Sequence, residues 1–373
     1  MFENLTYLQL QQYWWFLVAL LAALFVFLSF VQGGQSLLFS IAKNEDEKDL
    51  IVNALGRKWE LTFTTLVMFG GALFAAFPLF YATSFGGAYY VWMAILFCFI
   101  IQAVAYEYRK KPNNFLGQKS YELFLLINGT LGIILIGVAL ATLFTGGNFV
   151  VNSMNLSHWT KSSYGLEALL NFFNIAFGFM LFFLARINAA LYFINSIDDK
   201  NITKRAKVVL MYESAIFLIL FAYVIYSIVT MDGYAYNNEG IIHLEHFKYL
   251  HNLLAMPIVA GMLALGALLV VSGIVFGFKS KKAVWFSGIG TVLVVIALVL
   301  ILGYNNTAYY PSLADIQSSL TIQNSSGSKY TLVAMSYVSL MVPFVLAYII
   351  WAWRAMNKEP LSIDEIKKDT HHY

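Results

Sequence analysis

The chain has 373 residues, of which 60% are hydrophobic and only 12% are charged, and its mean hydropathy is +0.70. Soluble domains carry about 25% charged residues, so this composition excludes a soluble domain and indicates an integral membrane protein. The net charge of +3 does not indicate nucleic-acid binding, and the single cysteine, Cys98, excludes an intrachain disulfide and a cysteine-ligated cluster.

Nine hydrophobic runs are long enough to cross a membrane as helices, since about 18 apolar residues span the roughly 30 Å hydrocarbon core. These predicted spans 1 to 9 cover residues 13 to 36, 61 to 83, 89 to 107, 121 to 145, 167 to 194, 207 to 231, 252 to 277, 283 to 303 and 331 to 354. The N-terminal stretch lacks the features of a cleavable signal peptide and is expected to lead directly into span 1.

The sequence shows no repeat or low-complexity tract, so we expect a single membrane domain over residues 1–373. Three connections are long, covering residues 146 to 166, 232 to 251 and 304 to 330. Because apolar residues interrupt the last of them, we expect that loop to pack against the protein.

Lysine and arginine residues predict the orientation, because basic residues near span ends stay on the cytoplasmic side. Of the 23 Lys and Arg residues, Arg186 lies inside span 5, and Lys161, Lys248 and Lys329 lie in connections of one side. The remaining 19 lie after spans 1, 3, 5 and 7 and in the C-terminal tail. We therefore expect the N-terminus outside and the C-terminus in the cytoplasm.

Histidines are placed unfavourably for haem binding. They are His158, His243, His246, His251, His371 and His372, and none lies deep in a span. Helices that hold haem in a membrane supply His, Met or Cys ligands, so we do not expect this chain to bind haem by itself. In "HLEHFKYLH", His243 and His246 are three residues apart and could share a metal on a helix. A solvated loop is the default interpretation, and no metal site is predicted.

Two ionisable residues lie inside predicted spans, where an isolated charge costs several kcal/mol. Arg186 precedes the cytoplasmic end of span 5 and Glu213 follows the start of span 6, so both lie roughly 10 to 12 Å deep on adjacent antiparallel helices. We predict that they form a structural ion pair; the alternative is a transport gate.

Carboxylates also stand at the predicted cytoplasmic face. Glu60 opens span 2 in "RKWELTF", and Glu107 closes span 3, so an antiparallel pair of helices would bring both to one level. We predict that they serve proton entry. The alternatives are that Glu60 complements the helix dipole and that "EYRKK" is an ordinary charged rim. Trp59 is expected to anchor the span at the headgroup level.

Gln32 and Gln35 flank Gly33 and Gly34 in "FVQGGQSLL", near the cytoplasmic end of span 1. Two interpretations stay open for these amides. Glycines allow close helix packing that the amides would support with hydrogen bonds, or the amides form part of a ligand or proton site.

Several of these stretches resemble subunit II of cytochrome bd quinol oxidases. The run "GGALFAAFPLFYATSF" after Trp59 and Glu60 is similar to the second-helix signature of that family. The "YWW" opening, "YEYRKK", "PSLADIQSSLTIQNSSGSKYTLVAM", "VPFVLAY" and the closing "IDEIKKDTHHY" are similar too. The resemblance covers the whole chain in the order of the nine spans, and it is weak in spans 4 to 8.

The resemblance implies an all-α fold of nine transmembrane helices, arranged as two four-helix bundles plus one extra helix. It also implies a multi-pass protein of the cell (inner) membrane that pairs with a haem-bearing subunit I, which oxidises quinol and reduces oxygen to water. Haem b and haem d would lie in that partner, and none would be bound by this chain alone. Scaffolding, a cytoplasmic proton path and a structural quinone are then expected of this chain, and a small single-helix subunit is a further expected partner.

The family motif also bears on the proton path. In the family an Asp that follows the tryptophan opening span 2 is thought to line this path, and Glu60 stands at the matching position. Where the family shows "DGFDxGVG" in span 1, this chain reads "SFVQGGQS", so Ser29 and Gln32 occupy the two acidic positions and cannot ionise. We therefore expect Glu60, with Glu107, to carry protons, while Gln32 can only hold ordered water.

Two other functions are considered. A secondary transporter would couple ions through Arg186, Glu213 and Glu60, but the prolines form no matching pair of broken spans in two halves of the chain. A purely structural subunit without a proton role is the second alternative. In every case no residue of this chain is expected to perform bond chemistry.

Overall fold

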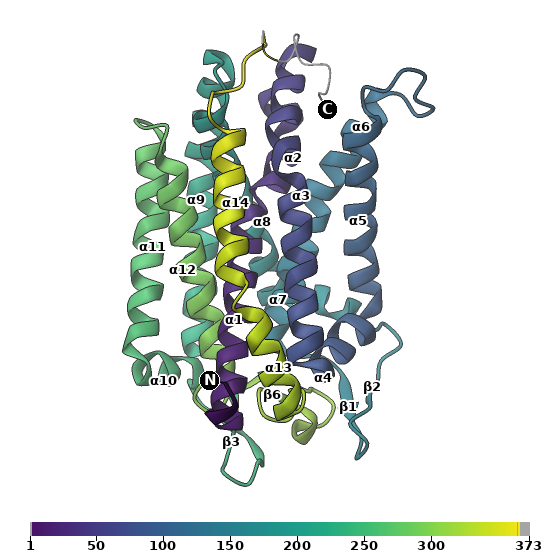
Figure 1. Ribbon diagram of the computed structural model, residues 1–373, viewed down its shortest axis with the longest axis vertical. Coiled ribbons are helices and arrows are strands. Elements are labelled where there is room, and N and C mark those ends of the chain that lie inside the picture. Colours follow the sequence, from purple (N-terminus) through teal and green to yellow (C-terminus); the bar gives the residue numbers. More distant parts are fainter. Residues whose placement is uncertain (1, 364, 366–373) are drawn as a thin grey trace.

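A computed structural model of the chain describes residues 2–363 and 365. Within them, nine helices are long and apolar enough to cross a membrane, and they stand side by side (Figure 1). The predicted all-α membrane fold is thus confirmed. The end of the tail, with His371 and His372, lies outside the described residues.

The first four spans contain several breaks. After η1 (Phe2–Asn4), span 1 consists of α1 (Tyr7–Leu28) and α2 (Phe30–Ile41). Span 2 is α3 (Glu45–Ala76), which is followed by α4 (Pro78–Tyr81) and the π-helical turn η2 (Ala82–Gly87). Span 3 is α5 (Tyr89–Tyr108), and span 4 consists of α6 (Gln118–Ile127), the π-helical turn η3 (Asn128–Gly132) and α7 (Ile133–Thr145).

The later spans are mostly single helices. They are α8 (Phe172–Ser196), α9 (Lys200–Thr230), α11 (Pro257–Gly277), α12 (Ala283–Gly303) and, for span 9, α13 (Lys329–Ser339) with α14 (Val342–Met356). Short helices η4 (Leu166–Leu170), α10 (Lys248–Ala255) and η5 (Ile316–Ser318) lie in the long connections.

Several boundaries differ from those predicted. Span 2 was expected to reach residue 83, but α3 ends at Ala76 because Pro78, which has no N–H to donate, starts a new helix. Span 5 was expected from residue 167, but α8 begins at Phe172, where the side chain of Asn171 caps the free N–H groups of the first turn. A proline at the end of span 2 and a side-chain cap at the start of span 5 therefore override hydropathy.

The three long connections each contain a two-stranded antiparallel sheet. The pairs are β1 (Phe149–Val151) with β2 (Ser157–Trp159), β3 (Gly233–Tyr236) with β4 (Ile242–Glu245), and β5 (Ala308–Tyr310) with β6 (Leu320–Thr321). Tyr309, Tyr310 and Leu320 are buried. The loop over residues 304 to 330 thus packs against the protein, as predicted.

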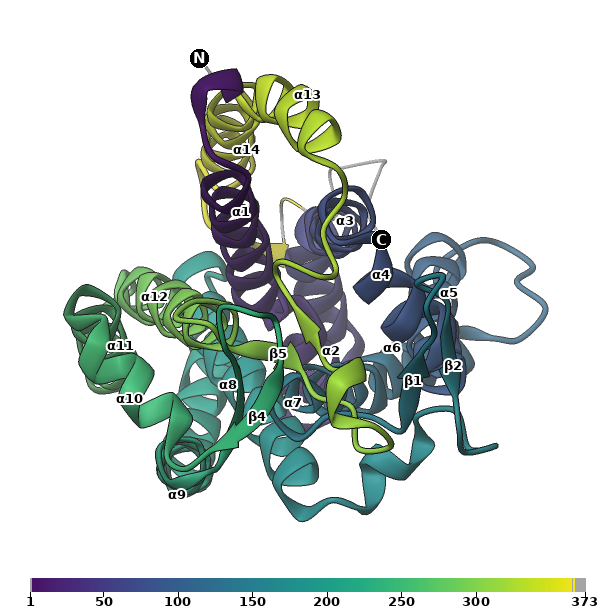
Figure 2. The ribbon, with the colours of Figure 1, turned by 90° about the horizontal axis from the view of Figure 1, so that it is seen from below.

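The helices fall into two groups around α1. Seen from below, α8, α9, α11 and α12 lie on one side, and α3, α5 and α6 lie on the other (Figure 2). The α14 helix runs along the outside of the bundle, and Trp353 is its only buried residue. Span 9 is therefore attached to the bundle through few side chains along α14.

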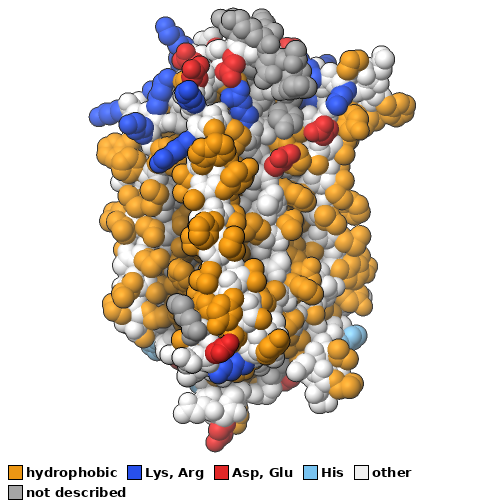
Figure 3. Space-filling model, in the orientation of Figure 1, with side chains coloured by type: hydrophobic (Ala, Val, Ile, Leu, Met, Phe, Trp, Pro, Cys, Tyr) orange, Lys and Arg blue, Asp and Glu red, His pale blue; other side chains and the backbone are white. Residues whose placement is uncertain are grey.

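Charged side chains gather at the end of the molecule where α2 ends and α3 begins (Figure 3). We call this the basic end, and the opposite end, with the three small sheets, the loop end. On the face shown in Figure 3, apolar side chains cover the surface between the two ends, as expected for contact with lipid or with other apolar helices.

Candidate functional site

Glu60 is exposed on α3, near the basic end, and Glu107 is exposed in the last turn of α5. Between them, the ring of Trp59 stacks on the ring of Tyr106, with centroids 5.6 Å apart and planes inclined by 14°. Trp59 is thus packed between two helices. Over residues 2–363 and 365, neither carboxylate takes part in a hydrogen bond or ion pair, and the two are not joined to each other.

Gln32 lies in a buried group of polar side chains from α2, α5 and η3, which we call the amide cluster: Gln32, Gln35, Gln102, Tyr106 and Asn128. Gln102 Oε1 accepts from Gln32 Nε2 at 2.9 Å, from Gln35 Nε2 at 2.8 Å, and from Asn128 Nδ2. Gln35 also donates to the Tyr106 hydroxyl at 3.0 Å. The amide cluster therefore ties three helical segments together.

The amide cluster still has unused hydrogen-bonding capacity. Gln32 Oε1, Gln102 Nε2 and Asn128 Oδ1 are buried without a partner among the described residues. Buried polar atoms are normally satisfied by protein or by ordered water. The sequence pointed to Gln32 and Gln35 only. Gln102 and Tyr106 are one helical turn apart, and this polar pair within span 3 was the signal that was missed.

An ion-pair network lies next to the amide cluster at the basic end. Arg109 has almost no exposed surface and donates to Asp49 at 2.7 Å and to Glu122 at 2.9 Å and 3.1 Å. Lys48 pairs with Glu122 at 3.0 Å, and Lys110 pairs with Asp49 at 2.9 Å. One interpretation of "EYRKK", which contains Arg109 and Lys110, was an ordinary charged rim, whereas Arg109 is a buried link between α3, α5 and α6.

Arg186 and Glu213 form an ion pair between α8 and α9. Arg186 Nε donates to both carboxylate oxygens of Glu213 at 2.9 Å, and its Nη2 forms a further close contact with Oε1. Arg186 Nη1 also donates to Ser36 Oγ of α2 at 3.0 Å. The pair thus joins three helices, and its importance for assembly stays a prediction.

Lys58 is a charged residue whose burial the sequence did not reveal. It has no exposed surface, and its Nζ atom lacks a hydrogen-bond partner in the part of the chain that the structure describes. Hydropathy placed Lys58 in a basic connection. Its contact with the ring of Trp353 joins residues 295 positions apart, so the local sequence gave no sign of its burial.

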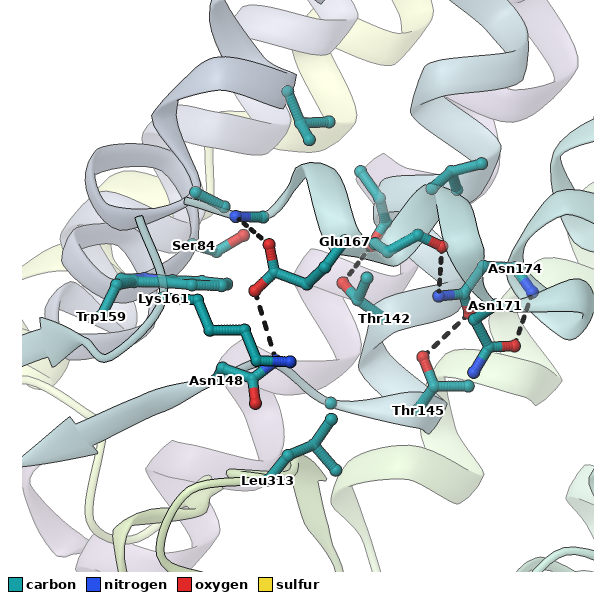
Figure 4. A pocket seen from close by; sticks show the side chains of 18 of the residues that line it. Ser84, Thr142, Thr145, Asn148, Trp159, Lys161, Glu167, Asn171, Asn174 and Leu313 are labelled. Atoms are coloured by element: carbon teal, nitrogen blue, oxygen red, sulfur yellow. Dashed lines mark hydrogen bonds between the residues drawn. The ribbon is translucent and has the colours of Figure 1, made fainter. Parts of the chain in front are cut away.

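A cavity of about 340 Å³ opens at the loop end, between the start of α5, the end of α7 and the start of α8 (Figure 4). It was not predicted. Its walls include Trp92, Trp159, Tyr310, Lys161, Glu167, Thr142, Thr145, Asn148, Asn171 and Asn174. The cavity thus combines aromatic rings, amides and two opposite charges.

Glu167 is held firmly in this cavity. Its carboxylate accepts from the Ser163 hydroxyl at 2.6 Å, the Gly165 N–H at 3.0 Å and the Asn148 amide at 3.2 Å. Burial alone would raise the pKa of Glu167, but these hydrogen bonds outweigh it and lower the pKa below its usual value of 4.5. The carboxylate is therefore ionised at neutral pH.

The loop histidines take part in pairs with acids. His246 Nδ1 lies 3.0 Å from Asp232, and His251 Nδ1 lies 2.9 Å from Glu245. Within residues 2–363 and 365, no group of three or more His, Cys, Asp or Glu side chains is placed to hold a metal ion.

Residues 10–356 match the protein family described as cytochrome bd terminal oxidase subunit II. Over 373 aligned residues the chain is 26% identical to cytochrome bd-I ubiquinol oxidase subunit 2 of Escherichia coli K12, covering 96% of this chain and 97% of that one. It is 27% identical to cytochrome bd ubiquinol oxidase subunit 2 of Bacillus subtilis 168, covering 93% and 98%. The fold is similar to a chain of the bd oxidase from Geobacillus thermodenitrificans, with a TM-score of 0.65, 14% identity and coverage of 93% and 98%.

Proposed function

Because the chain belongs to the cytochrome bd terminal oxidase subunit II family, we propose that Glu60, assisted by Glu107, takes up the protons that its oxidase consumes. The chain is a subunit of a quinol oxidase, a multi-subunit oxidoreductase of the respiratory chain, and a multi-pass protein of the bacterial inner membrane. The proposal assigns a role within that complex to two carboxylates of this subunit.

The partner in this proposal is a haem-bearing subunit I. Haem b and haem d of that partner would supply the electron transfer from quinol to oxygen. The described part of the chain supports such a division, since its histidines, His158, His243, His246 and His251, lie outside the nine candidate spans. A small single-helix subunit stays a prediction.

The observation that carries the proposal is the contrast between free and engaged carboxylates at the basic end. Asp49 and Glu122 are bound by Arg109 and by lysines. Glu60 and Glu107 have no such partner within the described chain. Free carboxylates can gain and lose a proton without breaking an ion pair.

The surroundings of Glu60 suggest where its protons go. Phe63, Val67 and Phe74 are exposed on one face of α3, and Glu60 lies at the basic end of this apolar stripe. The positive-inside rule places the basic end in the cytoplasm. We propose that a partner covers the stripe, so that Glu60 lies at its edge and passes protons from the cytoplasm to the partner.

Gln32 has a supporting role in this proposal. The amide cluster cannot ionise, but its three buried atoms without partners favour ordered water. Such water would allow protons to move next to Trp59 and Tyr106 without an acidic side chain in span 1.

The test is Glu60→Gln in the purified oxidase complex. We expect oxygen consumption to fall about tenfold or more, in line with the loss of a proton-transferring side chain, while haem content stays unchanged. Glu359→Gln is the matched control, because Glu359 is also an exposed carboxylate at the end of span 9 near the basic end. Full activity of Glu60→Gln would reject the proton role and leave a purely structural subunit.

We also propose a site for a structural quinone. A largely apolar slot of about 390 Å³ lies between α1, α3 and span 9, and its volume is in the range of small-molecule sites. Thr65 and Ser339 are among the residues lining it. Quinone extracted from the purified complex should be lost on Ala72→Phe, which narrows the slot, and quinone content that does not change would reject this site.

A further inference from the structure

The cavity at the loop end contains a negative charge with no bonded cation. The three groups that bind Glu167 are a hydroxyl, an amide and a backbone N–H, all of them neutral. Glu167 forms no ion pair within the described chain. An ionised carboxylate that is partly withdrawn from water favours a positively charged ligand.

Aromatic walls favour the same kind of ligand. Trp92 and Trp159 line the cavity, and their indole N–H groups are engaged, donating to Ser84 Oγ at 3.3 Å and to the Thr83 carbonyl at 2.8 Å. The two hydrogen bonds fix the ring orientations. Aromatic faces attract an ammonium group, and this attraction is independent of the carboxylate.

Lys161 adds a positive charge to the same cavity. Its side chain is exposed and forms no ion pair within the described residues. The amide of Asn171, which also lines the cavity, can donate to an acceptor. The cavity thus offers a site for an anion as well as a site for a cation.

The rim of the cavity connects it to lipid. Leu170, which lines the cavity, and Phe172, two residues further along the chain, leave 87% and 69% of their surface exposed. The cavity lies where α7 ends and α5 begins, which is the level of the lipid headgroups for helices that span the membrane. A ligand with an apolar part can therefore enter from the membrane.

We propose that this cavity binds the headgroup of a zwitterionic, amine-bearing phospholipid, such as phosphatidylethanolamine. The amine would lie against Glu167 and the aromatic rings, the phosphate would lie near Lys161, and the acyl chains would leave over Leu170 and Phe172. A quinone headgroup fits less well, because its carbonyl oxygens are acceptors and would face an anionic carboxylate.

The test measures lipid binding to the whole oxidase complex after delipidation in detergent. Phosphatidylethanolamine or phosphatidylglycerol is added back, and bound lipid is counted by native mass spectrometry. We expect the wild-type complex to prefer phosphatidylethanolamine. Glu167→Gln should weaken phosphatidylethanolamine binding about tenfold and leave phosphatidylglycerol binding unchanged, because only the former carries an amine.

Three further variants separate the effect of the charges from the fold of the loop. Lys161→Met should weaken binding of both lipids, whereas Lys329→Met, the matched change at another lysine of the loop end, should weaken neither. Ala139→Phe narrows the cavity from α7 without removing a side-chain hydrogen bond, and it should exclude both lipids even if Glu167→Gln disturbs the loop.

Four outcomes would overturn the proposal. The first three are equal retention of the two lipids by the wild-type complex, unchanged phosphatidylethanolamine binding in both Glu167→Gln and Ala139→Phe, and recovery of quinone in place of lipid from this cavity. A loss caused equally by Lys329→Met would also contradict it, because that lysine does not line the cavity.

Discussion

The Nζ atom of Lys58 lies 4.8 Å from the ring centroid of Trp353, so the only buried residue of α14 packs against a lysine that has no exposed surface. Phe30 and Trp285 pack edge-on against the same indole ring. Lys58 is therefore enclosed at the site where span 9 is attached to the bundle, and its charge has no bonded counter-ion within the described chain.

Replacing this lysine by an apolar residue should stabilise the protein. A buried charge costs several kcal/mol, and a cation–π contact returns only about 2 kcal/mol. We therefore expect Lys58→Met to raise the thermal unfolding midpoint of the complex, measured by tryptophan fluorescence.

Lys48 provides the control on the same helix. Its Nζ atom bonds Glu122 at 3.0 Å and Glu45 at 2.9 Å. Lys48→Met should therefore lower the midpoint, because the buried Glu122 carboxylate loses one of its cationic partners. If both variants lower the midpoint equally, Lys58 is stabilised by something other than its aromatic surroundings.

Arg186→Leu should impair assembly of the subunit. The substitution leaves Glu213 largely buried with no positive partner, and breaking a buried pair in this way costs about 3–5 kcal/mol. The amount of complex recovered from membranes, read from its haem absorbance, should fall. Normal recovery would show that the pair is dispensable for assembly.

The double variant Arg186→Leu/Glu213→Leu separates the pair from its individual charges. Two apolar residues leave no buried charge, so assembly should recover relative to Arg186→Leu alone. Failure of the double variant to recover would instead point to the bond from Arg186 to Ser36, since that bond is lost in both variants.

Hydropathy and charge were sufficient to identify the nine spans, because both properties are read from the local sequence. The facing positions of Arg186 and Glu213 also followed from span counting, since α8 and α9 are consecutive antiparallel helices. The break of span 1 at Ser29 and the extension of α3 back to Glu45 were not predicted. Polar residues of α3 outside the apolar run continue the helix because Asn44 caps it and neighbouring helices cover it.

The candidate site could be predicted only in part, because it depends on contacts between distant parts of the chain. Glu60 and Glu107 stood out as acids at span ends, but their freedom from ion pairs depends on which distant groups engage Asp49 and Glu122. The loop-end cavity likewise brings residues 84 to 174 together with Tyr310. Such contacts between remote segments are set by the fold, and a single sequence carries no local signal for them.

The amide cluster should respond unequally to two similar substitutions. Gln102 Oε1 accepts from three side chains, so Gln102→Leu removes one hydrogen bond from each of three buried amides, and an unsatisfied buried donor costs about 1–3 kcal/mol. Gln32→Leu removes one donor, together with an oxygen that has no partner among the described residues.

We therefore expect a clear drop in the thermal midpoint for Gln102→Leu and a small change for Gln32→Leu. Equal effects would mean that ordered water, rather than Gln102, satisfies most of the amide cluster.

The loop-end cavity should lose stability in acid through Glu167. The hydrogen bonds to its carboxylate lower the pKa in the folded state below the usual value of 4.5. A group whose folded pKa is lowered contributes stability above its unfolded pKa, and this contribution is lost as the pH falls through the folded pKa. The difference in thermal midpoint between wild type and Glu167→Gln should thus be constant from pH 7 to about pH 5 and shrink below about pH 4.5. A difference that persists unchanged at pH 3 would mean that Glu167 acts through packing and not through its charge.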